Sequence, residues 1–220
     1  EFLVVFASNK DRTSSGNYAM HIKSDNSIVN FNNRDGFRLK YKQIEGDFEA
    51  EVSIKSMNNE GRWGVAGLQV RETLSDTTNF FSVFATSKEK DGFTVFYRKK
   101  VLESPTWNPL YGGTNLPHTK LWMKRENDSI YVAYKGRYDE LINMQVHPNF
   151  LKESLYLGVS VSGGNESKYS KFVFNDFTID NTQIDLKELP AFEVNTLSEG
   201  YDTQYNELHT DFTIKDDEIL

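Results

Sequence analysis

The sequence contains no cysteine among its 220 residues. No disulfide can therefore brace the fold, and no thiolate is present to form a zinc site. Proline is scarce too, with five residues, three of which lie between Leu102 and His118. Stability must come from packed side chains, and a chain of this length is large enough to bury a core as one β-domain or as a domain with a tail.

Long apolar runs and blocks of one charge are also missing. No segment approaches the roughly 20 apolar residues of a membrane helix, so we expect no membrane insertion. The net charge of −7 is spread along the chain, which argues against nucleic acid as a partner. The first residue is Glu rather than Met, so we expect a mature or excised piece of a longer protein, and the lack of a signal peptide at its start excludes nothing. Its composition favours a bacterial surface or secreted, hence extracellular, protein.

Aromatic residues are abundant, with sixteen Phe and eleven Tyr, and such rings suit half-buried sheet surfaces. In the segment 48–54, apolar residues alternate with Glu and Ser, which predicts a strand with one dry face. Turn signals recur roughly every 8 to 15 residues and no helical period persists, so the pattern predicts an all-β fold. Further strands are expected at 64–72, 80–86, 93–99, 121–126, 130–135, 155–162 and 171–179.

Two segments interrupt this rhythm. The segment from Leu102 to His118 is predicted to be a long loop, of a length at which loops are often functional. After Asn181 the chain becomes acidic and weakly periodic. We therefore expect a β-sandwich over residues 1–181, and over residues 182–220 an acidic tail, a linker or extra edge strands.

The run from Gly46 to Arg98 contains GDFEAEVSIK, a tryptophan, AGLQVRETL and an aromatic strand ending in YR. It resembles a bacterial family of concanavalin A-like, laminin G-like jelly-roll modules that share this order of motifs. The likeness extends from about Asp35 to Ile179, and AGLQVRETL is its most specific part. The resemblance implies a jelly roll of two antiparallel sheets. Such modules are attached to glycoside hydrolases, polysaccharide lyases or adhesins, or stand alone, so no single activity is implied.

The strand expected at 64–72 carries the first candidate site. Alternation places its aliphatic residues on one face and Trp63, Gln69 and Arg71 on the other. A sugar surface needs a flat ring for stacking beside planar donors such as guanidinium and amide groups. The alternative is that Arg71 pairs with Glu72 or Glu51, and that Trp63 merely covers the sheet edge.

The segment from Leu102 to His118 carries the second candidate, because Trp107 and Tyr111 stand beside a Gly-Gly pair. Its alternative is a loop pinned to the body by its own aromatic rings. The predicted carbohydrate-binding residues are Trp63, Gln69, Arg71, Arg98, Trp107 and Tyr111.

Alternate carboxylates in the segment EGDFEAE suggest an enzyme. If Glu45, Asp47, Glu49 and Glu51 lie on one strand, neighbours share a face about 6.5 Å apart, near the spacing that glycoside hydrolysis uses. The pattern resembles that of laminarinase-like retaining hydrolases, but Gly46 stands where those enzymes have a bulky apolar residue. We expect a solvated strand face here, and keep a glycoside hydrolase using Glu45 or Glu49 as a further alternative.

Four scattered histidines have no paired spacing, so we expect no transition-metal cofactor. Calcium stays open, because loops of β-sandwiches supply suitable oxygen ligands. Together these patterns predict a non-catalytic, lectin-like, carbohydrate-binding module of a larger protein, with a glycan or polysaccharide and the adjoining domains as partners. The alternative is a structural or protein-interaction domain of a surface protein.

Overall fold

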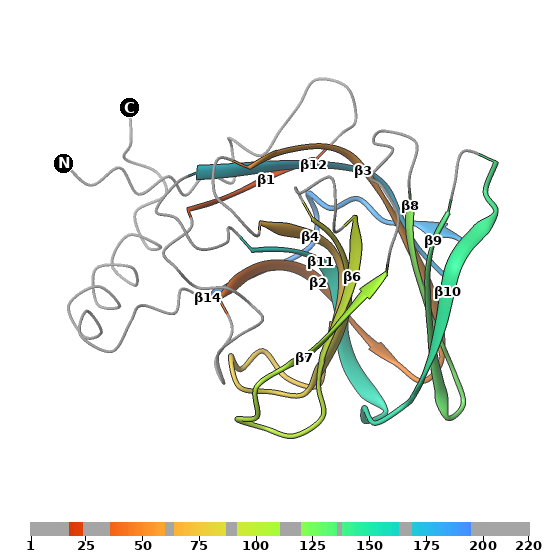
Figure 1. Ribbon diagram of the computed structural model, residues 1–220. Coiled ribbons are helices and arrows are strands. Elements are labelled where there is room, and N and C mark those ends of the chain that lie inside the picture. The colour runs from red at the N-terminus through yellow and green to blue at the C-terminus, as the bar shows by residue number, and fades with distance from the viewer. Residues whose placement is uncertain are drawn as a thin grey trace, which may run out of the picture.

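Two stacked antiparallel sheets form the protein, as the computed structural model in Figure 1 shows. The structure describes residues 18–23, 36–59, 64–86, 92–110, 120–135, 138–162 and 169–194. Its strands are β1 (Tyr18–Lys23), β2 (Phe37–Glu45), β3 (Phe48–Asn59), β4 (Val65–Arg71), β5 (Phe80–Thr86), β6 (Phe93–Arg98), β7 (Thr106–Leu110), β8 (Lys120–Glu126), β9 (Ser129–Lys135), β10 (Leu141–Pro148), β11 (Ser154–Ser162), β12 (Tyr169–Ile179), β13 (Thr182–Gln183) and β14 (Ala191–Val194).

Sheet A has the strand order β1-β12-β3-β8-β9-β10, with β13 paired to β12. Sheet B has the order β14-β2-β11-β4-β5-β6-β7. The chain passes from sheet B to sheet A between β2 and β3 and returns between β3 and β4, so β3 lies in the opposite sheet from the strands before and after it. The predicted all-β jelly-roll sandwich of two antiparallel sheets is confirmed.

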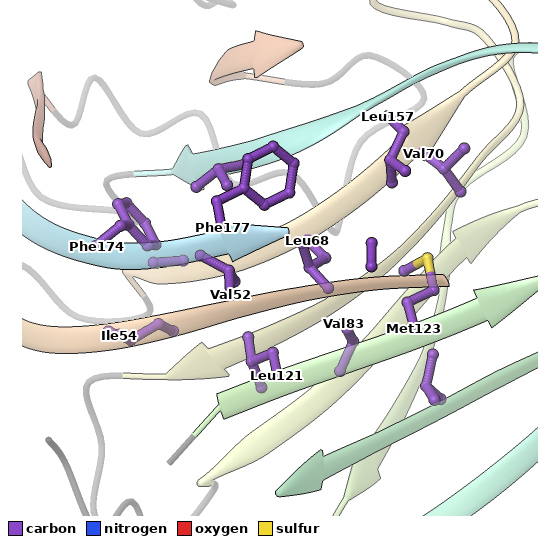
Figure 2. Close-up of a cluster of buried hydrophobic side chains, with 14 of the residues drawn as sticks. Val52, Ile54, Leu68, Val70, Val83, Leu121, Met123, Leu157, Phe174 and Phe177 are labelled. Carbon is purple, nitrogen blue, oxygen red and sulfur yellow. The ribbon is translucent and has the colours of Figure 1, made fainter. Parts of the chain in front are cut away.

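The main core lies between the two sheets and follows the alternation of the strands. Figure 2 shows side chains from both sheets converging there. Because each such aliphatic side chain contributes about 1.5–3 kcal/mol when it is fully buried, this layer is the principal stabilising contact. Buried members labelled in the figure are Val52, Ile54, Leu68, Val70, Val83, Leu121, Met123, Leu157, Phe174 and Phe177.

Residues 182–194 belong to the packed sandwich. Strand β13 pairs with β12, and β14 forms the edge of sheet B beside β2. Leu186 between them is 4% exposed and joins the main core. The packed strands of the sandwich therefore continue past residue 181. Residues 195–220 lie outside the described residues, and their role as an acidic tail stays a prediction.

The segment predicted to be one long loop, Leu102 to His118, is partly a strand. Residues 106–110 form β7, which pairs with β6 in an antiparallel hairpin. Pro105 and Pro109 favoured a loop in the sequence analysis. An edge strand nevertheless tolerates proline at its start and at a position where the backbone N–H group needs no partner. The remaining residues of the expected loop that follow β7, 111–118, lie outside the described residues.

Two glycines occupy positions where backbones approach closely. A Cβ atom on Gly158 of β11 would lie 1.8 Å from the carbonyl oxygen of Lys40. A Cβ atom on Gly67 of β4 would lie 2.3 Å from the carbonyl oxygen of Val83. The atoms met are backbone atoms of paired strands, which cannot move without disturbing the sheet. Glycine is therefore required at both positions.

We predict that Gly158→Ala lowers the free energy of unfolding by about 3 kcal/mol, because the new methyl group must push two strands apart. The control is Ser160→Ala on the same strand, whose hydroxyl is fully buried and makes no hydrogen bond. Removing that hydroxyl is expected to be neutral or slightly stabilising. Urea unfolding of both variants checks this, and equal stabilities of the two would contradict the close approach.

Candidate functional site

The face of sheet B that points away from the main core combines aromatic, hydroxyl, amide and guanidinium groups. On β4, Leu68 and Val70 enter the main core, so alternation turns Gln69 and Arg71 to the opposite face. The register continues this outer face across β5 and β6, where Arg71 lies opposite Phe80 and Phe80 lies opposite Arg98. The predicted division of β4 into two faces is correct.

This outer face is closed to solvent. Gln69, Arg71 and Phe80 are 0% exposed, and Arg98 is 1% exposed. The structure therefore corrects the expectation of an open sugar-facing surface at Gln69, Arg71 and Arg98, because these side chains lie in a second buried layer. The apolar members of that layer are Phe37, Leu39, Val65, Phe80, Phe84 and Phe96, with Tyr41, Leu74 and Phe192 packed against them.

A phenyl ring lies between two guanidinium groups at the centre of this layer. The Cζ atoms of Arg71 and Arg98 each lie 5.2 Å from the ring centroid of Phe80. Arg71 also lies over Phe37, at 4.2 Å from its centroid. Each desolvated cation–π contact of this kind contributes about 2 kcal/mol. We call this set of four residues the arginine–phenylalanine cluster.

The guanidinium groups of the cluster hold two loops by hydrogen bonds to backbone carbonyls. Arg71 Nη2 donates to Ser75 O at 2.7 Å. Arg98 Nη1 donates to Asp76 O at 3.1 Å and to Thr78 O at 3.2 Å. Arg98 Nε donates to Glu103 O at 2.6 Å. The loop after β4 and the loop after β6 are therefore both fixed to the outer layer of sheet B.

The two carboxylates considered as partners of Arg71 are engaged elsewhere. Glu72 Oε2 accepts a hydrogen bond from Asn79 and lies 3.6 Å from Lys152 Nζ. Glu51 pairs with Lys135 on the outer face of sheet A. Sequence proximity suggested Glu72, but adjacent residues of a strand point to opposite faces.

A row of side chains runs across sheet B from Gln69 to its exposed edge. The register places Gln69 opposite Ser82, Ser82 opposite Phe96, and Phe96 opposite Trp107. Both polar atoms of the Gln69 side chain are buried without a hydrogen-bond partner. Trp107, at the other end of the row, is 44% exposed. The row therefore ends in an accessible indole ring on the last strand of the sheet.

Among the predicted carbohydrate contacts, Gln69, Arg71, Arg98 and Trp107 come together on this one face, and only Trp107 is exposed. Trp63 and Tyr111 lie outside the described residues. The sequence interpretation missed Phe80 as the centre of the cluster. Alternation in the segment FFSVFAT would have placed it on the same face as Arg71.

The carboxylates of EGDFEAE do not all lie on one strand, although Glu49 and Glu51 share β3. Glu45 ends β2 in sheet B, whereas Glu49 lies on β3 in sheet A, because Gly46 with φ +75° turns the chain between the sheets. Glu49 Oε1 accepts a hydrogen bond from Trp122 Nε1 at 2.7 Å. Asp47 Oδ1 accepts one from the backbone N–H of Asn127 at 3.0 Å. The expected single strand face is thus corrected, and these two acids serve the packing of neighbouring strands.

No group of three or more His, Asp or Glu side chains is placed to hold a metal ion within the ranges that the structure describes. Calcium binding stays an open prediction. A search of the same ranges finds no helix with the length and apolarity needed to cross a membrane.

No protein-family model matches this sequence, and no curated protein matches it. Among solved structures, a functionally unknown protein from Saccharomyces cerevisiae has a TM-score of 0.63 at 12% identity, over 79% of this chain and 91% of that chain. A mutant of the GH43 protein BlXynB from Bacillus licheniformis has a TM-score of 0.50 at 10% identity, over 72% of this chain and 32% of that chain. A legume lectin-like domain from Entamoeba histolytica has a TM-score of 0.47 at 12% identity, over 80% of this chain and 90% of that chain. The chain has the concanavalin A-like jelly-roll fold, and at these identities the likeness establishes the fold alone.

We predict that Arg98→Lys lowers the free energy of unfolding by about 3 kcal/mol, because the carbonyl groups of Asp76, Thr78 and Glu103 lose their guanidinium donors together. Lys100→Gln is the control, since Lys100 is 78% exposed and its ion pair is a surface one. Chemical denaturation checks both variants. Wild-type stability in Arg98→Lys would show that the guanidinium does not anchor the two loops.

Proposed function

We propose that this domain is a non-catalytic, lectin-like carbohydrate-binding module of a larger bacterial secreted or cell-surface protein, and that its sugar contact lies at the β7 edge of sheet B. The observation that carries this proposal is the exposed ring of Trp107. It is the predicted contact that remains accessible within the described residues. Indole rings bind the C–H faces of sugars by stacking while the N–H group bonds to a hydroxyl.

The support beneath the ring favours this use. Trp107 lies opposite Phe96, which is 4% exposed, so the exposed indole neighbours a buried residue of β6 in the strand pairing. Arg98 fixes the same hairpin through its bond to Glu103 O. A ring held in place before binding loses little conformational entropy when a ligand arrives, which raises the affinity of a small contact.

Gln69, at the buried end of the same row, lies outside the proposed contact because its side chain is 0% exposed. Its amide has a free donor and a free acceptor, and a buried amide without partners is costly. It lies three strands from Trp107 in the same row, hence about 14 Å away along the hydrogen-bonding direction. The proposed sugar contact is therefore confined to the exposed end of the row, at Trp107.

The geometry favours binding over hydrolysis. Glu45 and Glu49 belong to different sheets, and Glu49 is engaged by Trp122. Glycoside hydrolysis needs two carboxyl groups facing one bond at a defined separation. The proposed module therefore holds a glycan in place, and any chemistry on that glycan belongs to an adjoining domain of the parent protein.

A second candidate function is a protein-interaction domain, and one observation favours it. The loop between β6 and β7 exposes two aliphatic side chains, Val101 at 56% and Leu102 at 55%. Leu102 has φ +65°, a strained conformation for a leucine, and it is held there by its N–H bond to Thr77 O. Exposed apolar side chains on a fixed loop suit a protein partner such as a neighbouring domain.

We predict that Trp107→Ala reduces binding to the best ligand of a glycan array at least tenfold, with unchanged thermal stability, because the stacking surface is removed. Tyr138→Ala is the matched control, since Tyr138 is an 84% exposed aromatic residue that lies beside β10 of the other sheet. It should bind as the wild type does. Isothermal titration with the selected glycan supplies the affinities.

The double variant Val101→Ser/Leu102→Ser separates the two functions. Glycan binding should survive this change, because neither side chain lies in the row of Trp107. Equal glycan affinity in Trp107→Ala and the wild type would refute the proposed site. The interaction function would be established instead if no glycan binds and a neighbouring domain of the parent protein binds the wild type but not the double variant.

A further inference from the structure

Strand β10 is weakly secured at the edge of sheet A. Among the described strands it pairs with β9 alone, and its register shifts between Ile142 and Gln145. Its outward apolar side chains are largely exposed, with Leu141 at 45%, Met144 at 53% and Val146 at 54%. Little apolar surface is therefore buried by this strand, and segments of this kind open at low free-energy cost.

The inward side of β10 is mostly polar. The register places Gln145 opposite Val132 and His147 opposite Ile130, and both partners belong to the main core. His147 Nε2 lies 3.1 Å from Gln145 Oε1, so the two polar side chains satisfy each other. Apart from Ile142, β10 contacts the interior of the sandwich through the side chains of Gln145 and His147.

His147 reaches across the sandwich to sheet B. Its ring packs edge-on against Phe81 of β5, with centroids 5.0 Å apart, and lies 5.7 Å from the ring of Tyr97 of β6. Phe150, just after β10, lies 6.0 Å from Tyr97 and 6.3 Å from Phe81. The imidazole thus joins the edge strand of one sheet to an aromatic layer of the other.

Positive charges surround this contact. Lys99 Nζ lies 5.2 Å from the ring centroid of Tyr97 and 5.9 Å from that of Phe150. Arg125 of β8 lies in the same cross-strand row as His147, with Ile130 between them. The charged groups of the loop after β10 are Lys152 and Glu153, and they pair with Glu72 and Arg125 respectively. Tyr97, on β6, is the other titratable side chain at the ring.

We propose that β10 is an acid-released edge strand, closed by the neutral imidazole of His147 and opened when that imidazole takes up a proton. Burial, and after it the charge of Lys99, holds the pKa of His147 below its ordinary value of 6.5 in the closed strand. An opened strand restores hydration and the ordinary pKa, so the open state binds the proton more tightly. Closure is therefore fully favoured above pH 6.5 and weakens as the pH falls below it. This inference does not depend on the proposed glycan site.

Hydrogen exchange of the backbone amides of β10 tests this directly, with rates normalised for the intrinsic effect of pH. We expect at least a fivefold loss of protection in residues 141–147 between pH 7.5 and pH 5, while the amides of β3 keep theirs. In His147→Phe the ring packing is retained without a titrating group, so this pH response should vanish.

Two further variants keep the test decisive if His147→Phe folds poorly. Lys99→Gln removes a repelling charge, so it should raise the pKa of His147, measured by NMR, and reduce the loss of protection. His21→Gln, which changes a histidine on β1 at the opposite edge of sheet A, should respond as the wild type does. Equal normalised protection of β10 at both pH values in the wild type, or an undiminished response in His147→Phe, would overturn the proposal.

Discussion

The outer layer of sheet B depends on the cation–π contacts that the guanidinium groups of Arg71 and Arg98 make with the ring of Phe80. Each guanidinium lies at the same distance from the ring and bonds onward to carbonyl groups of a neighbouring loop. Two buried cations in one layer cost several kcal/mol of desolvation, which ring contacts and charge-assisted hydrogen bonds must offset. The arginine–phenylalanine cluster therefore couples the position of two loops to the burial of the second apolar layer on sheet B.

This coupling changes what the most specific sequence motif means. Arg71 belongs to AGLQVRETL and Arg98 ends the aromatic strand, and their polarity first suggested a surface that meets sugar. In the fold Arg98 supports the hairpin that carries Trp107, one strand beyond it, and Arg71 holds the loop after β4. Under the proposed function, Arg98 positions the hairpin and the indole ring of Trp107 contacts the sugar.

Alternation of side chains predicted the sandwich, the main core and the division of β4 into two faces, because that pattern is local. It could not predict that the second face is buried, since burial depends on what covers a sheet. The turn at Gly46 was misjudged for a similar reason: a positive φ sends Glu45 and Glu49 to different sheets, although their spacing fits one strand. The cross-sheet contact of His147 joins residues far apart in sequence, so spacing gave no sign of it.

The central claim is that Arg98 lies in a closed layer, bonded to backbone carbonyls beside Phe80. Nuclear magnetic resonance of the arginine side chains tests it most directly, through the hydrogen exchange of Nε–H with water. The account predicts a resolved Arg98 Nε–H signal that exchanges at least a hundredfold more slowly than that of free arginine and shows contacts to the Phe80 ring protons. Exchange at the rate of free arginine, without ring contacts, would contradict it.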